Sequence, residues 1–290
     1  MRPDDVRFGP NAFDVPAGRS PIRVRWLGTA GFAIEHDGHT LLLDPYVTRA
    51  SLLECVRAPL ASDPEAVRRF APKADAIVAG HTHFDHVLDV PAIAKATGAR
   101  VFGSRSCANL CRLEGVPEAQ IVDVEDMRSP KAIRAEVGPF SLRFVPSCHS
   151  SFLFGRIPMP GDISDCDQIP LTTPGYRCGA VFGVDIRVAG RRLYHLGSAD
   201  LLDGWPERDV DLLLMCVAGW TTTERFTQRV MGALRPGAIL LSHWDNFFFP
   251  MDRGAIALPA MRMPKLVDAL TAVDPSVRIG TLPLLGELAL

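Results

Sequence analysis

The 290-residue sequence predicts an α+β fold in which two similar layers of sheet and helix face each other. Three observations support this prediction. Each half of the chain begins with short β-prone runs joined by tight turns, each continues with helices and strands, and each contains apolar strands that end in histidine-bearing loops. We therefore expect residues 21–290 to form a single domain, preceded by an irregular, proline-containing arm over residues 1–20.

In the first half, three β-prone runs form an antiparallel meander, with Asp37-Gly38 as the tight turn of its second hairpin. Asp63 followed by Pro64 is typical of a helix start. Asp89 and Gly98 mark the two ends of an alanine-rich helix. The predicted strands are 22–27, 31–35, 40–43, 76–79, 100–102 and 121–124, and a further helix is predicted around 104–114.

The second half repeats this arrangement and contains one long loop. Two hairpins, three further strands and two helices are predicted. The strands are 132–137, 140–145, 180–188, 192–196, 211–217, 238–241 and 277–280, and the helices are 223–234 and 263–272. Residues 150–175 are rich in proline and glycine, and loops of this length are often functional. We expect this loop to be a substrate lid that uses Phe152, Phe154 and Arg156.

A dense group of metal-ligand side chains follows the apolar segment 76–79. His81 and His83 lie on the same side of an extended backbone, as two ligands of one ion would. Asp85 and His86 come after a turn and can reach a second position nearby. Imidazole and carboxylate groups suit divalent transition metals, so the run 81–86 predicts a metal site.

Two more histidines, His149 and His243, stand just beyond the ends of predicted strands, and they can complete a site begun by the run at 81–86. Asp44 ends a buried strand, where a carboxylate needs a partner, and we expect it either to accept the second N–H of a metal-bound histidine or to cap a turn. The other three histidines are interpreted differently. His36 and His39 are expected to be solvated turn residues, and His195 a hydrogen-bonded core residue.

Composition narrows the class of protein further. The 31 basic and 33 acidic residues are intermixed, and this balance argues against a nucleic-acid partner. Neither a signal-peptide pattern nor an apolar run long enough to span a bilayer is present, so we expect a cytoplasmic enzyme without an integral membrane segment. The seven cysteines form no CxxC pair and are interpreted as mostly free thiols. The oligomeric state stays open, a homo-oligomer included.

These residues resemble the metallo-β-lactamase superfamily, whose HxHxDH signature stands here as residues 81–86, followed in order by His149, Asp200 and His243. The runs 26–32 and 43–45 resemble the branch of ascorbate-phosphate lactonase-like and N-acylphosphatidylethanolamine phospholipase D-like hydrolases. The resemblance implies a four-layer αββα sandwich of two mostly antiparallel sheets. It also implies two divalent metal ions, with zinc as the first expectation and manganese or iron as alternatives.

The resemblance also implies a role for each ligand. His81, His83 and His149 would bind the first ion, and Asp85, His86 and His243 the second. Asp200 would bridge the two ions, although the superfamily pattern places this acid directly after a glycine, and here Ser198 and Ala199 intervene after Gly197. Asp203 is the alternative bridge, and a mononuclear site is the fallback. Without a bridge, the second ion should bind weakly.

The expected activity is that of a metal-dependent hydrolase in which a metal-bound hydroxide attacks an ester, lactone or phosphodiester of a small molecule or lipid. Asp85 would orient the hydroxide and transfer a proton to the leaving group. Trp220, Trp244 and Asn246, with the aromatic pair Phe247-Phe248, are candidates for substrate contacts. The alternative function is a mononuclear iron oxidoreductase, similar to a persulfide dioxygenase, on the same fold.

Overall fold

The computed structural model describes residues 3–9, 12–14, 20–125, 133–151, 155–204 and 208–290. Its centre is a pair of seven-stranded sheets. The strands of the first sheet, in spatial order, are β14 (Glu287–Ala289), β1 (Arg23–Gly28), β2 (Gly31–His36), β3 (His39–Leu43), β4 (Ala76–Val78), β5 (Arg100–Gly103) and β6 (Ile121–Asp123). Strand β14 was not predicted, and it extends the meander by pairing antiparallel with β1.

The second sheet is formed by the second half of the chain. Its strands, in spatial order, are β13 (Arg278–Gly280), β12 (Ala238–Ser242), β11 (Leu212–Cys216), β10 (Arg191–Leu196), β9 (Val181–Val188), β8 (Phe140–Ser147) and β7 (Ile133–Val137). All of these strands correspond to predicted ones. The expectation that each half contributes its own sheet is therefore confirmed, except that β14 returns to the first sheet.

The sandwich is confirmed, but its sheets are mixed rather than mostly antiparallel. In the first sheet, β14, β1, β2 and β3 pair antiparallel, whereas β3 to β6 pair in parallel. In the second sheet, β7 to β10 pair antiparallel, and β10 to β13 in parallel. The parallel pairs are those whose strands are joined by longer crossovers, whereas hairpins join β1 to β2, β2 to β3, β7 to β8 and β9 to β10.

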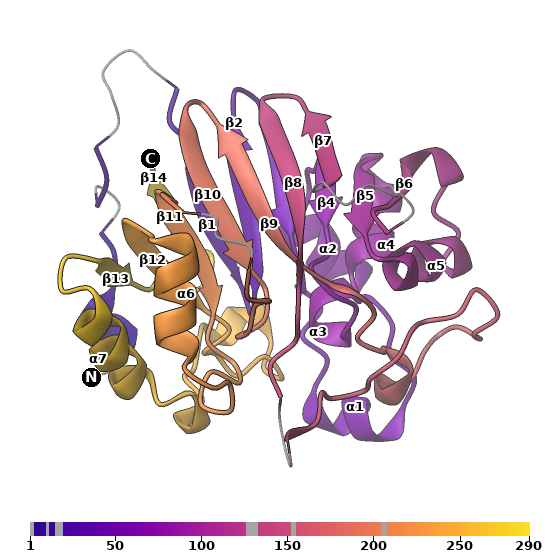
Figure 1. Cartoon of the computed structure of the whole chain (residues 1–290). Helices are drawn as coiled ribbons and strands as arrows, with labels where there is room; N and C mark the ends of the chain where they lie inside the picture. Colours follow the sequence, from indigo (N-terminus) through magenta and orange to yellow (C-terminus); the bar gives the residue numbers. More distant parts are fainter. Residues whose placement is uncertain (1–2, 10–11, 15–19, 126–132, 152–154, 205–207) are drawn as a thin grey trace.

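Helices cover the outer faces of the two sheets. Helices α6 (Phe226–Leu234) and α7 (Met263–Val273) lie on the side of the second sheet, whereas the helices of the first half lie on the other side (Figure 1). The first-half helices are α1 (Leu52–Arg57), α2 (Pro64–Phe70), α3 (Phe84–Val87), α4 (Val90–Thr97) and α5 (Arg105–Leu113). Sheet and helix together give the four layers of the predicted αββα sandwich.

Alternation along the strands places one core between the sheets and another beneath the helices of the first half. Phe32 and Ile34 belong to the core shared with the second sheet, and Ala33 between them belongs to the helix-covered core. Phe102 of β5 and Phe144 of β8 stack across the inter-sheet layer with ring centroids 6.0 Å apart. Packing of this kind fixes the ends of the strands relative to one another.

Local sequence signals account for the helix boundaries. Asp63 caps α2 by accepting the N–H of Glu65 at 2.8 Å, and Pro64 occupies the first turn. Gly98 ends α4 in the left-handed conformation, with φ of 78°. Helix α6 starts later than predicted, at Phe226, because Arg225 adopts a left-handed conformation with φ of 49°.

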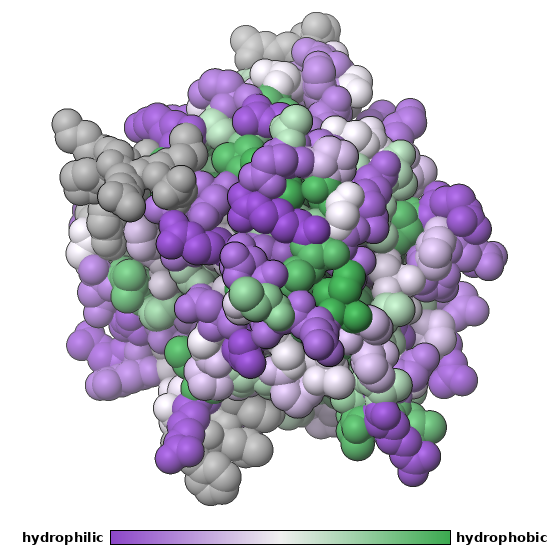
Figure 2. All heavy atoms as spheres, turned by 90° about the vertical axis from the view of Figure 1, so that its right-hand side faces the viewer, coloured by the Kyte–Doolittle hydropathy of each residue, from purple (hydrophilic) through white to green (hydrophobic). Residues whose placement is uncertain are grey.

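Short 3-10 turns occur in the connections. They are Pro3–Val6, Glu118–Gln120, Thr173–Gly175, Met251–Arg253 and Pro259–Met261. The face that carries α4 and α5 is largely hydrophilic, with small hydrophobic areas between the charged side chains (Figure 2). Among the described residues, no helix has both the length and the apolar character needed to cross a membrane.

Candidate metal centre

Six of the predicted ligands lie on helix α3 or in the loops that follow strands β4, β8 and β12. His81 follows β4, and His83 precedes α3 with an extended backbone. Asp85 and His86 lie on α3 itself, in which all four residues are buried. His149 follows β8, and His243 follows β12. The structure brings these side chains together into two groups of three.

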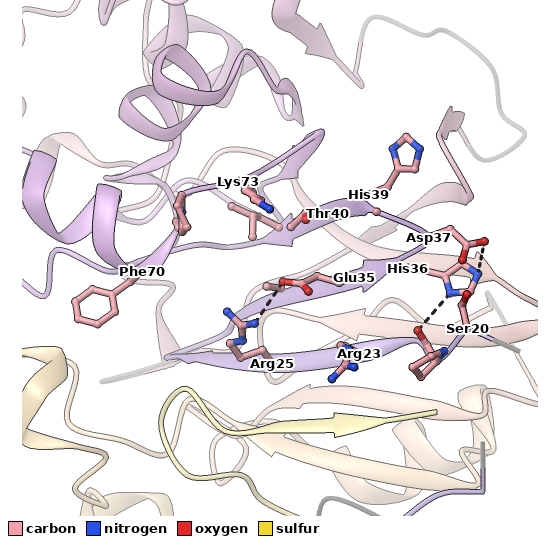
Figure 3. Close-up of a pocket in the computed structure, with 16 residues that line it drawn as sticks. Ser20, Arg23, Arg25, Glu35, His36, Asp37, His39, Thr40, Phe70 and Lys73 are labelled. Atoms are coloured by element: carbon pink, nitrogen blue, oxygen red, sulfur yellow. Dashed lines mark hydrogen bonds and ion pairs between the residues drawn. The ribbon is translucent and has the colours of Figure 1, made fainter. Parts of the chain in front are cut away.

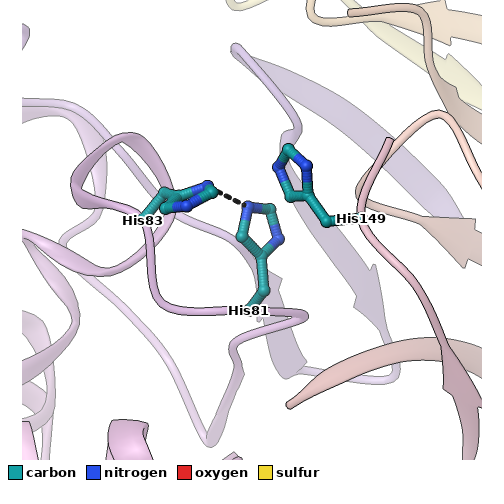
Figure 4. A group of neighbouring side chains, drawn as sticks. All are labelled: His81, His83 and His149. Carbon is teal, nitrogen blue, oxygen red and sulfur yellow. Dashed lines mark hydrogen bonds between the residues drawn. The ribbon is translucent and has the colours of Figure 1, made fainter. Parts of the chain in front are cut away.

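The first group consists of His81, His83 and His149. Their candidate ligand atoms all lie within 4.8 Å of one another. Nε2 of His81 is 3.1 Å from Nδ1 of His83, and the three rings converge on a common point (Figure 4). The ring centroids of His83 and His149 are 4.7 Å apart. The structure thus places His149 beside His81 and His83, although it lies far from them along the chain.

Backbone carbonyls select the ring nitrogens that are free to bind a metal. Nε2 of His83 lies 2.8 Å from the carbonyl oxygen of Pro158, and Nδ1 of His149 lies 2.7 Å from that of Ser150. A carbonyl only accepts, so these nitrogens carry the protons, and Nδ1 of His83 and Nε2 of His149 keep free lone pairs. Pro158 belongs to the long loop 150–175, which therefore supports a candidate ligand directly.

The pKa values also favour neutral imidazoles in this group. Burial lowers the pKa of His81, and neighbouring histidines lower it further. Burial likewise lowers the pKa of His83, and burial together with His83 lowers the pKa of His149 to about 3. Metal ligation requires the neutral ring, so these three histidines are in the binding form at neutral pH.

The second group consists of Asp85, His86 and His243, and all three residues are buried. Oδ2 of Asp85 lies 3.1 Å from Nε2 of His243 and 3.7 Å from Nε2 of His86. Burial alone would raise the pKa of Asp85, but His86 and His243 hold this pKa well below its usual range. The rings of His81 and His86 are 3.8 Å apart between centroids, so the two groups adjoin.

The carboxylate of Asp44 lies next to His86, behind the two ligand groups. Oδ2 of Asp44 lies 3.0 Å from Nδ1 of His86 and 2.8 Å from Nε2 of His195, and its Oδ1 accepts the N–H of Gly80 at 2.6 Å. Burial works against the charge on Asp44, but His86 and His195 keep its pKa well below the usual range. The expectation that His195 is a hydrogen-bonded core residue is confirmed, and its partner is this carboxylate.

The two groups fit divalent metal ions. Each offers three nitrogen or oxygen ligand atoms, a set that suits zinc, iron and other first-row metals. Nδ1 of His81 and Nδ1 of His243 are buried and have no hydrogen-bond partner among the described residues. The ligand atoms of each group lie in close proximity on side chains that are buried, except for the half-buried His149, and unpaired ring nitrogens such as these are costly to bury unless they bind a cation.

Asp200 is not brought together with these six side chains. Its Oδ1 accepts hydrogen bonds from Nη1 of Arg229 and from the N–H of Leu201, both at 2.8 Å. Asp203, the alternative bridge, accepts from Nε of Arg229 at 2.9 Å and is largely exposed. Arg229 on α6 engages both acids, because a guanidinium group pairs strongly with carboxylates.

Most of the predicted substrate contacts have structural partners. Trp244 is buried and packs on Trp26 with ring centroids 4.8 Å apart, so it belongs to the core. Trp220 donates its indole N–H to the carbonyl of Met261 at 2.7 Å. Oδ1 of Asn246 accepts the N–H of Phe248 at 3.2 Å. Arg156 is exposed, and Phe152 and Phe154 lie outside the described residues.

Two features border the ligand groups. The ring of Phe247 lies 5.3 Å from that of His243, between centroids, and the side chain is half-buried. A pocket of about 460 Å³ opens beside His149 and is mainly apolar. Its lining includes Pro146, Ile157, Pro160, Val181 and Phe182, together with the carboxylate-bearing Glu125.

A second pocket, of about 560 Å³, lies on the outer surface of β1, β2 and β3 (Figure 3). It contains the turn histidines. His39 is partly exposed, as expected, but His36 is buried, with Nδ1 3.4 Å from the carbonyl of Pro21. The expectation of a solvated His36 was therefore wrong, because residues 20–21 fold over it. The pocket does not include any of the six candidate ligands.

Comparison with known proteins identifies the family. A family model described as a beta-lactamase superfamily domain matches residues 39–245, which include all six candidate ligands. This chain belongs to the metallo-β-lactamase superfamily. Within the superfamily it is 29% identical over 239 residues to a UPF0173 metal-dependent hydrolase from Anaeromyxobacter sp. (strain K), covering 80% of this chain and 77% of that protein.

Solved structures show the same fold. Igni18, a metallo hydrolase from Ignicoccus hospitalis, matches with a TM-score of 0.58 and 18% identity, over 93% of this chain and 98% of that one. CmlA, a diiron β-hydroxylase from Streptomyces venezuelae, matches with a TM-score of 0.55 and 14% identity, over 95% of this chain and 55% of that one. The predicted superfamily and sandwich fold are thus confirmed.

Proposed function

We propose that this protein is a dinuclear metal-dependent hydrolase of a small-molecule or lipid ester, lactone or phosphodiester. The observation that supports this proposal most directly is the presence of two adjoining groups of ligand side chains. They are His81, His83 and His149 in the first group and Asp85, His86 and His243 in the second. The metal-dependent hydrolase from Anaeromyxobacter supports the reaction class. Zinc is the ion we expect, because histidine nitrogen and carboxylate oxygen are its common catalytic ligands.

Divalent ions held by the two groups would supply Lewis acidity, polarising a substrate oxygen and lowering the pKa of water towards 7. The protein's own residues orient this chemistry. The carbonyls of Pro158 and Ser150 fix the tautomers of His83 and His149. Asp44 fixes the orientation of His86 by its contact with Nδ1.

Asp85 is the proposed proton acceptor. Its Oδ2 faces His243 and His86, so Oδ1 is the oxygen that would take a proton from water. The lowered pKa of Asp85 means that this group is ionised at neutral pH and can act as the acceptor. The proton would then pass from Oδ1 to the leaving group.

The pocket beside His149 supports a substrate with an apolar group. Its walls are mostly hydrocarbon, His149 is neutral at neutral pH, and Glu125 is the one charged residue among the described residues of the lining. Such a wall favours an acyl chain or an apolar ring over a polyanion. We therefore favour an ester or lactone with an apolar acyl portion, and we expect nucleic acids to be excluded.

Metal analysis and a substrate screen test the proposal. The purified protein is expected to bind two zinc ions per chain, the second more weakly because Asp200 is engaged by Arg229. It should then hydrolyse members of a panel of aryl esters, lactones and phosphodiesters, with a β-lactam included for comparison. Asp85→Asn should lose at least ~100-fold in kcat, in line with the loss of a general base. One iron per chain with oxygen consumption would instead establish the oxidoreductase alternative.

A further inference from the structure

A buried ion pair outside the two ligand groups holds the loop that carries His243. Nη1 of Arg49 lies 2.7 Å from Oδ2 of Asp245, and the two side chains are only 2% and 1% exposed. Arg49 lies in the connection between β3 and α1, and Asp245 follows His243 by two residues. The pair therefore joins the first half of the chain to the second, next to a candidate ligand.

The turn between β1 and β2 completes this contact. The carbonyl oxygen of Thr29 accepts the N–H of His243 at 2.7 Å, and the N–H of Thr29 donates to Oδ1 of Asp245 at 3.0 Å. The backbone of Thr29 thus binds both the N–H of His243 and the side chain of Asp245. The carboxylate of Asp245 receives Thr29 on one oxygen and Arg49 on the other.

The backbone of His243 needs such support. Its φ of 60° lies in the left-handed region, as do those of Thr29 at 49° and Arg49 at 56°. Residues other than glycine rarely adopt this conformation, and it persists where the surrounding structure enforces it. The direction in which the His243 ring points therefore depends on the contacts made by Asp245 and Thr29.

Stability alone is a poor explanation for the ion pair. Nε and Nη2 of Arg49 are buried without hydrogen-bond partners among the described residues. Nη2 also occupies the space of any side chain at Gly28, since a Cβ there would lie 1.5 Å from it. A buried ion pair with unsatisfied donors contributes little net stability compared with apolar residues in the same place. The Arg49–Asp245 pair is therefore better explained by a role in positioning the loop that carries His243.

We propose that Arg49 is a positioning residue which, through Asp245, holds His243 in place for the second metal ion. This inference rests on the proposed dinuclear site. It predicts an asymmetric effect, because the first group is held by other contacts, those of His83 with Pro158 and of His149 with Ser150. Loss of Arg49 should weaken the second ion and leave the first unchanged.

The test is a titration of metal-free Arg49→Met protein with Co²⁺, followed by visible absorption and checked by metal analysis. Two successive equivalents are expected for the wild type. For the variant, the first equivalent should bind as in the wild type. The dissociation constant of the second Co²⁺ should rise at least ~10-fold, which is the lower end of the range for loss of a contact that supports a metal ligand. The visible absorption band of this second Co²⁺ should also shift.

The double variant Arg49→Met/Asp245→Asn separates positioning from folding, since it leaves no buried charge unpaired. It should recover most of the thermal stability lost in Arg49→Met and still bind the second ion weakly. Arg143→Met is the matched control, because it removes an arginine located 3.0 Å from the buried Asp185 in the second sheet. This control should bind both ions as the wild type does.

Two results would overturn this inference but leave the proposed function standing. One is a dissociation constant for the second ion within twofold of wild type in both Arg49 variants, and the other is an equally large loss of second-ion affinity in Arg143→Met. If Arg49→Met does not fold, the double variant decides the question. A wild-type protein that binds fewer than two ions would overturn the proposed dinuclear function, and the inference with it, so the two failures are distinguishable.

Discussion

Asp44→Asn should weaken metal binding by the second group without removing a ligand. The substitution preserves shape but replaces one carboxylate oxygen by an NH₂ group. The N–H of Gly80, 2.6 Å from Oδ1, needs the remaining oxygen. The new NH₂ group must then face Nδ1 of His86 and Nε2 of His195, which lie 3.0 Å and 2.8 Å from the same carboxylate oxygen in the wild type.

The conflict between donors has a defined consequence. To accept from the new amide, His86 would have to move its proton from Nδ1 to Nε2, and Nε2 is the nitrogen that faces Asp85. The ring would then offer no lone pair to the second ion. Loss of such a supporting contact usually costs 10- to 100-fold in metal affinity, equivalent to about 1.4–2.7 kcal/mol at 25 °C.

The assay is competition between the metal-free protein and a chromophoric chelator for zinc, with both dissociation constants fitted. His195→Phe is the control. It removes one partner of Asp44 but leaves the contact between Asp44 and His86, so its effect on the second ion should be smaller than that of Asp44→Asn. Affinities within twofold of wild type for both ions in Asp44→Asn would refute the reasoning.

Three further predictions concern other parts of the molecule. Burial raises the pKa of the Cys178 thiol to about 12, whereas Cys166 is exposed. Iodoacetamide at pH 8 should therefore label Cys166 about 10³-fold faster than Cys178, as measured by peptide mass spectrometry. Asp89 is buried and accepts hydrogen bonds from two backbone N–H groups and two hydroxyls. In urea denaturation, Asp89→Ala should therefore lower the free energy of unfolding by about 2–5 kcal/mol, whereas Asp89→Asn should lower it by less than about 1 kcal/mol. Asp200→Asn should lose only about 0.5–1 kcal/mol of stability from its half-exposed pair with Arg229, with unchanged zinc content.

Each of these has a result that contradicts it. Equal labelling of the two thiols in the native protein would show that Cys178 is accessible and ionised. Similar losses of stability in the two Asp89 variants would mean that the charge, and not the hydrogen bonds, matters there. Loss of one zinc ion in Asp200→Asn would return Asp200 to the role of a bridging ligand.

Much of the site was predictable from the sequence because its ligands occupy strand ends. The run 81–86 is contiguous, and His149 and His243 each follow an apolar strand directly. Asp44 could be predicted as well, since a carboxylate at the end of a buried strand needs a partner. His195, the second partner of this carboxylate, was predicted to be a hydrogen-bonded core residue, but pairing across two sheets leaves no trace in local spacing, so Asp44 could not be named as its partner.

The remaining differences arise from long-range contacts. Asp200 stands in the expected order along the chain, but Arg229 on α6 reaches it, and spacing does not reveal this pairing. Trp244 lies in the core and packs on Trp26, a residue far away in the sequence. The parallel pairing in each sheet, in contrast, could have been predicted from the sequence. Predicted helices separate these strands, and strands joined through a helix usually pair in parallel.

Anomalous diffraction from crystals of the zinc-loaded protein, recorded on both sides of the zinc absorption edge, tests the central claim most directly. Two peaks are expected, one within reach of His81, His83 and His149 and the other within reach of Asp85, His86 and His243. A single peak shared by the two groups, or peaks bound by other residues, would contradict the assignment of two adjoining metal sites.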